Sequence, residues 1–291
     1  MKKGDEKTVK FKLQHDRISL NNIQGLLNEV GLGRFQLNLH LDQKLGSTSQ
    51  VYYAHDRWNN NRLVAVKFLK ANYIDSFVSQ HDLWALQTLQ DCNYVPKDII
   101  YNRSRNIFED NRYVPIEQYV GELGRICPLL PISRCIEGGA RRIPDNNCYV
   151  ITFEYIPGQT LWENLLHSDF TYFTEAQAKR FVRIFISNMI KLLDHHLISC
   201  DFNATNYYYD DPMLTFIDFG WCQVDVDKKD DRNEFLLKSL ENLWDRYPRI
   251  VQIFQSDSYS DFRYAVKSRQ IGLRTLLKHA WLKEGEESDL E

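Results

Sequence analysis

The sequence lacks an apolar run long enough to cross a membrane, because no stretch approaches the roughly 18–20 consecutive apolar residues that a spanning helix requires. Its start, M-K-K-G-D-E-K-T-V-K-F-K-L, is basic, but no apolar segment follows that could serve as a signal peptide. We therefore expect neither a membrane span nor a conventional secretory leader.

The chain also lacks paired cysteines of the C-x-x-C type. Its six cysteines are scattered along the sequence, at Cys92, Cys127, Cys135, Cys148, Cys200 and Cys222. This spacing indicates neither a zinc site nor a disulfide framework. We expect reduced thiols, as in a cytosolic protein.

A strong excess of one charge is missing as well. The 36 lysines and arginines nearly balance the 39 aspartates and glutamates, which gives a net charge of −3 and a pI near 6.3. Such a balance gives no general reason to expect binding to nucleic acid or to a membrane surface. With 43% hydrophobic and 13% aromatic residues, the 291 residues can form a sizeable core. The length suits one two-lobed domain or two small domains.

The N-terminal part changes from a helical to a strand pattern. Ser19 is a candidate N-cap for a helix over residues 20–30. From residue 35 to residue 41, apolar side chains recur at every second position, which predicts a half-buried strand. Two more strands are predicted over residues 50–55 and 63–69, joined by the turn W-N-N-N-R.

The stretch from Ile198 to Gly220 carries the residues on which the functional hypothesis depends. It contains Asp201, five residues later Asn206, and, after a predicted hairpin over residues 207–217, the triplet D-F-G. Phosphoryl transfer explains this spacing, because one aspartate orients the attacking hydroxyl while an amide oxygen and a second carboxylate hold Mg²⁺. D-F-G alone is a three-letter coincidence, but the ordered combination is far more specific.

Motifs upstream of this stretch complete a resemblance to the protein kinases. K-L-G-S-T-S-Q-V-Y-Y-A aligns without gaps with the kinase glycine-rich loop, and V-A-V-K matches the lysine motif of the third kinase strand. The resemblance implies an α+β, bilobal protein-kinase-like fold with a small β-rich N-lobe and an abbreviated, mainly α C-lobe. It assigns Lys67 to the α/β-phosphates of ATP, Asp201 to the substrate hydroxyl, and Asn206 and Asp218 to Mg²⁺ (or Mn²⁺).

A strand predicted over residues 148–154 ends in E-Y-I-P-G-x-x-L, which resembles the kinase hinge. By this resemblance, backbone groups near Glu154 and Ile156 pair with the adenine edge, and Phe153 closes the pocket behind the purine. The implied ATP-binding residues are Leu45, Gly46, Ser47, Val51, Ala65, Lys67, Phe153, Glu154 and Ile156.

The motifs depart from the kinase pattern in several places. Of the three loop glycines only Gly46 remains, with Lys44 and Ser49 at the outer positions, so we expect a stiffer or differently closed loop. The catalytic loop has Ser-Cys at residues 199–200 in place of His-Arg, and Asn203 replaces its lysine, which removes a cation near the γ-phosphate. No A-P-E motif follows, so the activation segment is expected to be abbreviated.

Lys67 should pair with a carboxylate from the helix after the third strand. Asp82 is one candidate, and Glu117, in a helix predicted over residues 115–126, is the other. The sequence leaves this choice open.

Further along the chain, apolar residues at helical spacing predict two long helices, over residues 175–195 and 227–244. His195, at the end of the first, is expected to be a helix-terminal residue and not a ligand or a base. The expected organisation is an N-terminal extension with a short helix (1–34), an N-lobe (35–156) with an insertion around 94–147, an abbreviated C-lobe (157–282) and an acidic tail (283–291).

The leading hypothesis is an ATP- and Mg²⁺-dependent Ser/Thr protein kinase of minimal architecture, similar to bacterial effector-type kinases. A small-molecule phosphotransferase, similar to the aminoglycoside and choline enzymes, is one alternative. A pseudokinase that binds a partner protein is another. We expect a protein substrate, a regulatory partner at the insertion and no nucleic acid. The expected location is the cytoplasm or, after export that leaves no apolar signal, a host cell.

Overall fold

The computed structural model shows an α+β protein, the fold class expected from the sequence, with helices and antiparallel sheets. The described residues are 20–38, 44–45, 49–70, 120–121, 123–125, 127–136, 141–143, 148–166, 173–195, 197–198, 203–219, 223–224, 236–238, 240–241, 254 and 256–283. Among the described helices, none is both long and apolar enough to cross a membrane.

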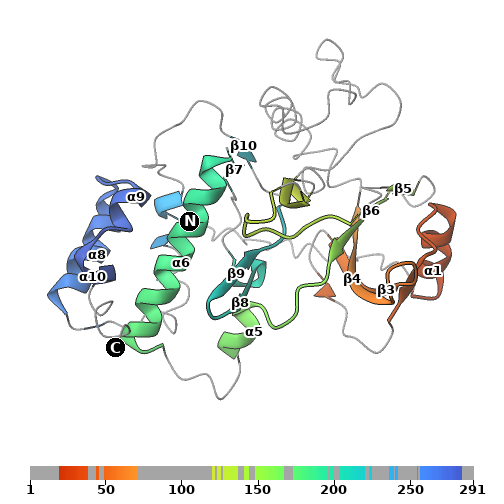
Figure 1. The fold of residues 1–291 in the computed structure, drawn as a ribbon, viewed down its shortest axis with the longest axis horizontal. Helices are drawn as coiled ribbons and strands as arrows, with labels where there is room; N and C mark the ends of the chain where they lie inside the picture. Colours follow the sequence, from red (N-terminus) through yellow and green to blue (C-terminus); the bar gives the residue numbers. More distant parts are fainter. Residues whose placement is uncertain are drawn as a thin grey trace, which may run out of the picture.

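A six-stranded antiparallel sheet forms one end of the molecule (Figure 1). Its order is β1-β3-β4-β6-β5, and β2 also pairs with β3. The strands are β1 (Phe35–Leu37), β2 (Lys44–Leu45), β3 (Ser49–Asp56), β4 (Arg62–Lys70), β5 (Arg141–Ile143) and β6 (Cys148–Glu154).

The predictions for the sheet are confirmed for β3, β4 and β6. The turn between β3 and β4 contains Asn60 and Asn61 at φ 50° and 59°, in the left-handed region that asparagine tolerates better than most residues. The strand predicted over residues 35–41 is shorter than expected in its described part, since β1 ends at Leu37 and Asn38 is not in a strand.

Helix α1 (Leu20–Glu29) packs on one face of this sheet, as Figure 1 shows. The sheet contributes alternate residues to the shared core, because successive side chains of a strand point to opposite faces. The helix ends before Gly31, whose φ of +75° suits glycine. The buried residues of this sheet core are Ile23, Leu26, Leu27, Leu32, Phe35, Tyr52, Ala54, Val64, Val66, Phe68, Ile136 and Val150.

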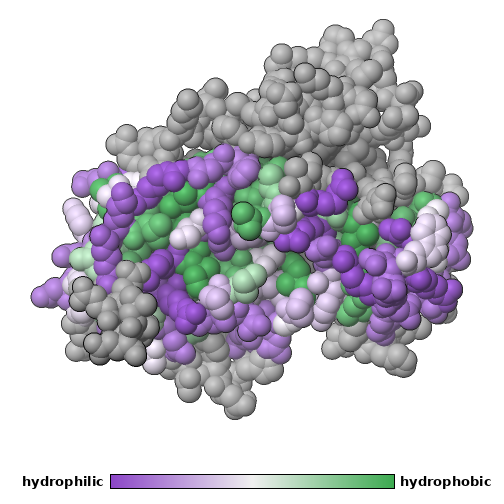
Figure 2. Space-filling model, viewed as in Figure 1, coloured by the Kyte–Doolittle hydropathy of each residue, from purple (hydrophilic) through white to green (hydrophobic). Residues whose placement is uncertain are grey.

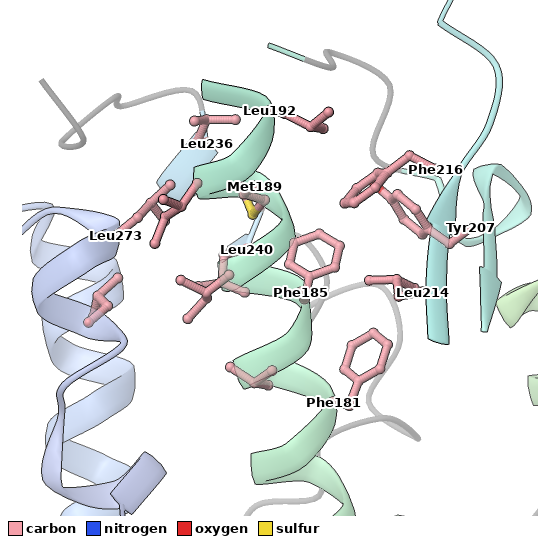
Figure 3. Close-up of a cluster of buried hydrophobic side chains, with 14 of the residues drawn as sticks. Phe181, Phe185, Met189, Leu192, Tyr207, Leu214, Phe216, Leu236, Leu240 and Leu273 are labelled. Carbon is pink, nitrogen blue, oxygen red and sulfur yellow. The ribbon is translucent and has the colours of Figure 1, made fainter. Parts of the chain in front are cut away.

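The second core surrounds helix α6 (Glu175–Asp194), which confirms the helix predicted over residues 175–195. Thr174 caps its start in a reciprocal capping box with Gln177, and His195 is its C-cap residue, as expected. Figure 3 shows that Phe181 and Phe185 point toward the hairpin of β8 (Tyr207–Asp210) and β9 (Met213–Phe216). Residues from the C-terminal region cover the other side of α6 in the same view.

The C-terminal helices were not predicted from the sequence. Helices α8 (Asp257–Ser268), α9 (Leu273–Leu276) and α10 (Ala280–Lys283) lie beside α6 (Figure 1). Glu175 joins them to α6, since its carboxylate accepts hydrogen bonds from Trp281 Nε1 at 2.8 Å and Ser256 Oγ at 3.3 Å. Within the helix predicted over residues 227–244, residues 236–238 and 240–241 are described, and they are helical.

Short elements connect the two cores. Helix α5 (Leu161–Leu166) follows β6, the 3₁₀ turn η3 (Ala204–Asn206) precedes the hairpin, and β7 (Leu197–Ile198) pairs with β10 (Gln223–Val224). The hairpin predicted over residues 207–217 is confirmed, with its turn at Asp211 and Pro212.

Candidate functional site

A cavity of about 410 Å³ lies between the sheet and the hairpin. Its volume falls within the range of about 300–1,000 Å³ that is usual for small-molecule sites. Its lining residues are Val51, Tyr53, Ala65, Lys67, Ser133, Phe153, Glu154, Ile156, Thr160, Trp162, Glu163, Thr205, Asn206, Tyr208, Ile217, Asp218 and Phe219.

The sheet wall of the cavity follows from strand register. Val51 lies opposite Lys67, and Tyr53 lies opposite Ala65, which in turn lies opposite Phe153. These five residues share one face of the sheet because cross-strand partners point to the same side. Since α1 covers the other face, this one is left to the cavity.

The hairpin wall begins with the 3₁₀ turn η3. Asn203 caps this turn, because its side-chain oxygen accepts a hydrogen bond from the Thr205 amide at 3.3 Å. Asn206 is buried, its Oδ1 accepts from Thr205 Oγ1 at 3.3 Å, and its carbonyl accepts from the Ile217 amide at 2.9 Å. That backbone bond brings the start of the hairpin next to Asp218.

Lys67 and Asp218 form the principal charged contact of the cavity, although 151 residues separate them in the sequence. The distance from Lys67 Nζ to Asp218 Oδ1 is 2.8 Å. The Lys67 side chain is only 7% exposed and that of Asp218 is 36% exposed, so the ammonium is the more deeply buried partner. A buried cation is costly unless a counterion accompanies it, and Asp218 supplies that charge.

Residues 131–136, here called the strap, close another side of the cavity with Ser133. Along one edge of the strap, the Ser133 amide donates to the Phe216 carbonyl at 3.0 Å, and the Phe216 amide donates to the Pro131 carbonyl at 2.7 Å. Along the other edge, the Ile136 amide donates to the Thr152 carbonyl at 2.9 Å. The strap therefore joins β9 to β6, the hairpin to the sheet.

The strap lies within the stretch expected as an insertion around residues 94–147. The described part of that stretch also supplies β5 to the sheet. It contains Gly121, where an added Cβ would lie 2.2 Å from the Cys135 sulfur, so the helical residues around Gly121 contact the strap closely. This part of the stretch is integral to the sheet and the cavity.

The segment after β6 forms the rim of the cavity. Glu154 donates its amide to the Arg134 carbonyl at 2.9 Å, and Arg62 lies 3.2 Å from its carboxylate. Thr160 and Glu163 form a reciprocal cap at the start of α5, with the Thr160 amide 2.7 Å from the Glu163 carboxylate and the Glu163 amide 3.2 Å from the Thr160 hydroxyl.

Two tyrosines, one from each wall, line the cavity. Tyr53 of β3 and Tyr208 of β8 form a side-chain hydrogen bond. Burial raises the pKa of Tyr208, and the negative charge of Glu163 raises it further, while the bond with Tyr53 lowers it. Tyr208 is therefore a neutral phenol at physiological pH.

The structure brings most of the expected site residues into this one cavity. Those it brings together are Val51, Ala65, Lys67, Phe153, Glu154, Ile156, Asn206 and Asp218. Asp201, Gly46, Ser47, Asp82 and Glu117 lie outside the described residues, and of Leu45 only the backbone is described.

Several residues of the cavity were missed at the level of sequence. Tyr53 could have been found, because it follows Val51 by two positions in a strand and must share its face. Tyr208, Thr160 and Glu163 depend on the packing of α5 against the hairpin, and Ser133 depends on the strap, for neither of which the sequence carries a short-range signal.

The donor set of the cavity fits a hard cation bound together with phosphates. Asn206 and Asp218 offer an amide oxygen and a carboxylate from neighbouring backbone positions, and Mg²⁺ typically takes one or two protein carboxylates together with substrate phosphates and water. Within the described residues, no group of three or more His, Cys, Asp or Glu side chains could hold a metal ion.

Comparison with known proteins adds no family assignment. No protein-family model matches the chain, and no curated protein matches it. Its function must be inferred from the cavity and the motifs.

Proposed function

We propose that this protein is an ATP- and Mg²⁺-dependent phosphotransferase that acts on Ser/Thr hydroxyls of a protein substrate. The observation that carries the proposal is the contact between Lys67 and Asp218 at 2.8 Å in a cavity that Asn206 also lines. These are the three described residues to which the kinase resemblance assigns phosphate and metal binding. Spacing in the sequence does not require them to meet, so their convergence supports the assignment.

The two hydrophobic cores support a bilobal protein-kinase-like fold. In this proposal the sheet core with α1 is the small lobe, and the core around α6 is the mainly α lobe. The cavity lies between the sheet and the hairpin, which contributes Tyr207, Leu214 and Phe216 to the second core. A nucleotide between two lobes is the arrangement that this fold uses.

The roles of the side chains follow from their charge and position. The Lys67 ammonium would bind the α/β-phosphates, and the Asn206 amide oxygen and the Asp218 carboxylate would hold Mg²⁺. Mg²⁺, when bound, neutralises charge on the phosphates. The base would lie against Val51 and Ala65 in the apolar part of the cavity.

The transfer itself exchanges one P–O bond for another. The substrate hydroxyl oxygen attacks the γ-phosphorus while the bond from that phosphorus to the β–γ bridging oxygen breaks, and ADP leaves. Asp201, which lies outside the described residues, would orient the hydroxyl and accept its proton. Lys67 stabilises the charge that remains on the ADP phosphates.

A small-molecule acceptor is the second candidate, and Asn203 favours it. The kinase resemblance expects a lysine here that would place a cation near the γ-phosphate. Asn203 instead uses its side chain to cap η3. Small-molecule phosphotransferases of this fold often lack that lysine.

The test is incubation with γ-³²P-ATP and Mg²⁺, with and without a generic protein substrate. Label on protein that is lost in Lys67→Ala and Asp218→Ala would support the protein kinase. Lys191→Ala and Asp261→Ala are matched controls, since both residues are exposed on helices away from the cavity and should retain activity. Full activity in both cavity variants would contradict the proposal.

Two other outcomes separate the alternatives. ATP turnover without labelled protein, followed by turnover in a screen of aminoglycosides, choline and sugars, would favour the small-molecule acceptor. No turnover, with ATP still raising the melting temperature, would leave a nucleotide-binding module that acts through a partner protein.

A further inference from the structure

We propose that Tyr53 and Tyr208 form a hydrogen-bonded bridge between the two walls of the cavity that fixes its width for a planar base. The inference rests on the proposed function, because it takes the base of a nucleotide as the ligand. It adds two positioning residues that the kinase motifs do not identify. The pair is called the tyrosine bridge below.

Strand alternation directs both tyrosines into the cavity. On β3, Tyr52 is buried in the sheet core, so its neighbour Tyr53 points to the opposite face and lines the cavity. On β8, Tyr207 is buried in the core around α6, so Tyr208 points away from that core and lines the same cavity. The tyrosine bridge thus links a strand of the sheet to a strand of the hairpin.

Neighbouring groups hold both rings in place. The Tyr53 ring meets the Tyr155 ring edge to face, with centroids 5.4 Å apart and planes at 85°. Tyr208 is 9% exposed, and its backbone forms an antiparallel bridge with Thr160, the residue that caps α5. Because both rings are packed, their hydroxyl groups have little freedom to separate while the walls stay in position.

The cavity of about 410 Å³ is present while the tyrosine bridge is formed, so the bridge does not block the ligand space. A site that keeps its shape before binding loses less conformational freedom when the ligand enters. Tyr208 also contributes an aromatic ring to the lining of the cavity, and aromatic rings stack favourably on bases. The bridge should therefore strengthen binding by holding that ring at a constant distance from the sheet wall.

The experiment is a double-mutant cycle with Tyr53→Phe, Tyr208→Phe and the double variant, each of which keeps its rings. The dissociation constant for ATP is measured by calorimetry on the full chain. We expect each single variant to bind about 2- to 10-fold more weakly, the range for one hydrogen bond. The double variant should bind no more weakly than either single variant, because both changes remove the same bond.

Tyr52→Phe is the matched control. It removes a tyrosine hydroxyl from the same strand, where Tyr52 donates to Gln50 Oε1 at 3.1 Å on the other face of the sheet. It should lower the stability of the chain without weakening ATP binding. Tyr208→Leu removes the ring as well and should weaken binding more than Tyr208→Phe.

A second readout needs no nucleotide. In urea unfolding of the ligand-free chain, Tyr53→Phe and Tyr208→Phe should each lower stability, and the double variant should lower it no further. Unchanged ATP affinity in both single variants, or additive losses in the double variant, would overturn the inference and leave the proposed function intact. Non-additive stability in a chain that never binds ATP would support the bond but overturn its role for a base, together with the proposed function.

Discussion

Asp218 presents its carboxylate to Lys67 from a left-handed backbone, at φ 60°. For an L-residue other than glycine this conformation costs about 1–2 kcal/mol, with asparagine and aspartate the least penalised. Strained residues of this kind cluster at functional sites, where the surrounding structure holds a side chain in position at a cost in stability.

We predict that Asp218→Gly is more stable than Asp218→Ala by about 1 kcal/mol in urea unfolding. Both variants remove the carboxylate, so their difference reports on the backbone alone. At Asp257, in the first turn of α8, the same pair should show the opposite order, because glycine is unfavourable in a helix. Equal stability of the two Asp218 variants would argue against a left-handed residue there.

The carboxylate partner of Lys67 can also be tested at single residues. Asp218 is the carboxylate that the structure places against Lys67, and both candidates from the sequence, Asp82 and Glu117, lie outside the described residues. We expect one of the variants Glu117→Gln and Asp82→Asn to lower kcat/KM about 10- to 100-fold, as misplaced catalytic groups do, and the other to change it less than about 2-fold. In a steady-state kinase assay, a loss confined to Glu117→Gln would assign Glu117, a loss confined to Asp82→Asn would assign Asp82, and no loss in either would contradict both assignments.

The resemblance to the kinase motifs anticipated Lys67, Asn206 and Asp218 as members of one site. For Asn206 and Asp218, their spacing after Asp201 also indicated phosphoryl transfer. Strand alternation would have added Tyr53. Alternation along β8 does not say which of its faces meets the cavity, so the places of Tyr208 and Ser133 depend on contacts between segments far apart in the sequence.

At the scale of elements, a buried amide adds a hydrogen bond to the apolar contact between α6 and the hairpin. Asn188 is 6% exposed, and its Nδ2 donates to the Leu214 carbonyl of β9 at 3.0 Å. We predict that Asn188→Ala lowers the free energy of unfolding by about 1–3 kcal/mol, because it leaves a buried carbonyl without this donor. Lys191→Ala, one turn along the same helix and exposed, should change it by less than about 0.5 kcal/mol.

The contact between α6 and α10 predicts a dependence of stability on pH. Partial burial of Glu175 opposes ionisation, but hydrogen bonds from Trp281, Lys179 and Ser256 and the Lys179 charge together lower its pKa below the ordinary 4.5. Its contribution is therefore complete above about pH 4.5 and is lost as the pH falls through the lowered pKa.

We expect Glu175→Gln to be less stable than the unaltered chain by about 0.5–1 kcal/mol at pH 7, the range for a partly exposed charged contact. In thermal unfolding series the difference should shrink below pH 4.5. Asp261→Asn, an exposed substitution on α8, should show no such convergence. A gap that widened in acid would contradict the sign of this pKa change.

The long elements and the hairpin of β8 and β9 were predictable, and the short C-terminal helices were not. α6 repeats its apolar spacing over several turns, whereas β3, β4 and β6 are runs rich in β-branched and aromatic residues. Helices α9 and α10 have only four residues each, too few to display a period, and they are fixed by packing of Leu273, Trp281 and Leu282 into the core around α6.

At the scale of the whole molecule, the α+β class was expected from the resemblance to the kinases, and the structure has this class. The sequence did not predict that the strap is integrated into the sheet and the cavity. Residues 94–147 carry no strong period, and the hydrogen-bond partners of the strap, Thr152 and Phe216, come later in the sequence. The sequence also does not indicate whether the two hydrophobic cores, which share no residues, unfold together.

We predict that the strap makes the two cores unfold as one unit. Ser133→Pro removes the amide that donates to Phe216, and Ser133→Ala, the control, keeps it. In hydrogen exchange with mass spectrometry, the slowest amides of β4 and α6 should share one opening free energy in the unaltered chain and in the control. In Ser133→Pro, the opening free energies of the β4 amides and the α6 amides should differ by about 1–3 kcal/mol. Equal opening free energies for β4 and α6 in the unaltered chain, in Ser133→Ala and in Ser133→Pro would indicate that other contacts join the cores.

The strap also limits how the cavity can open. A segment that is hydrogen-bonded to β9 along one edge and to β6 along the other holds these strands together where it lies, so any rotation of the two walls would have to turn about it. In such a rotation, a side chain or backbone group would move further the more distant it is from the strap. Groups next to Ser133 would therefore keep their spacing while a more distant rim moves outward. Entry of a ligand and alignment of its reacting end would then be separate events in one rigid-body movement.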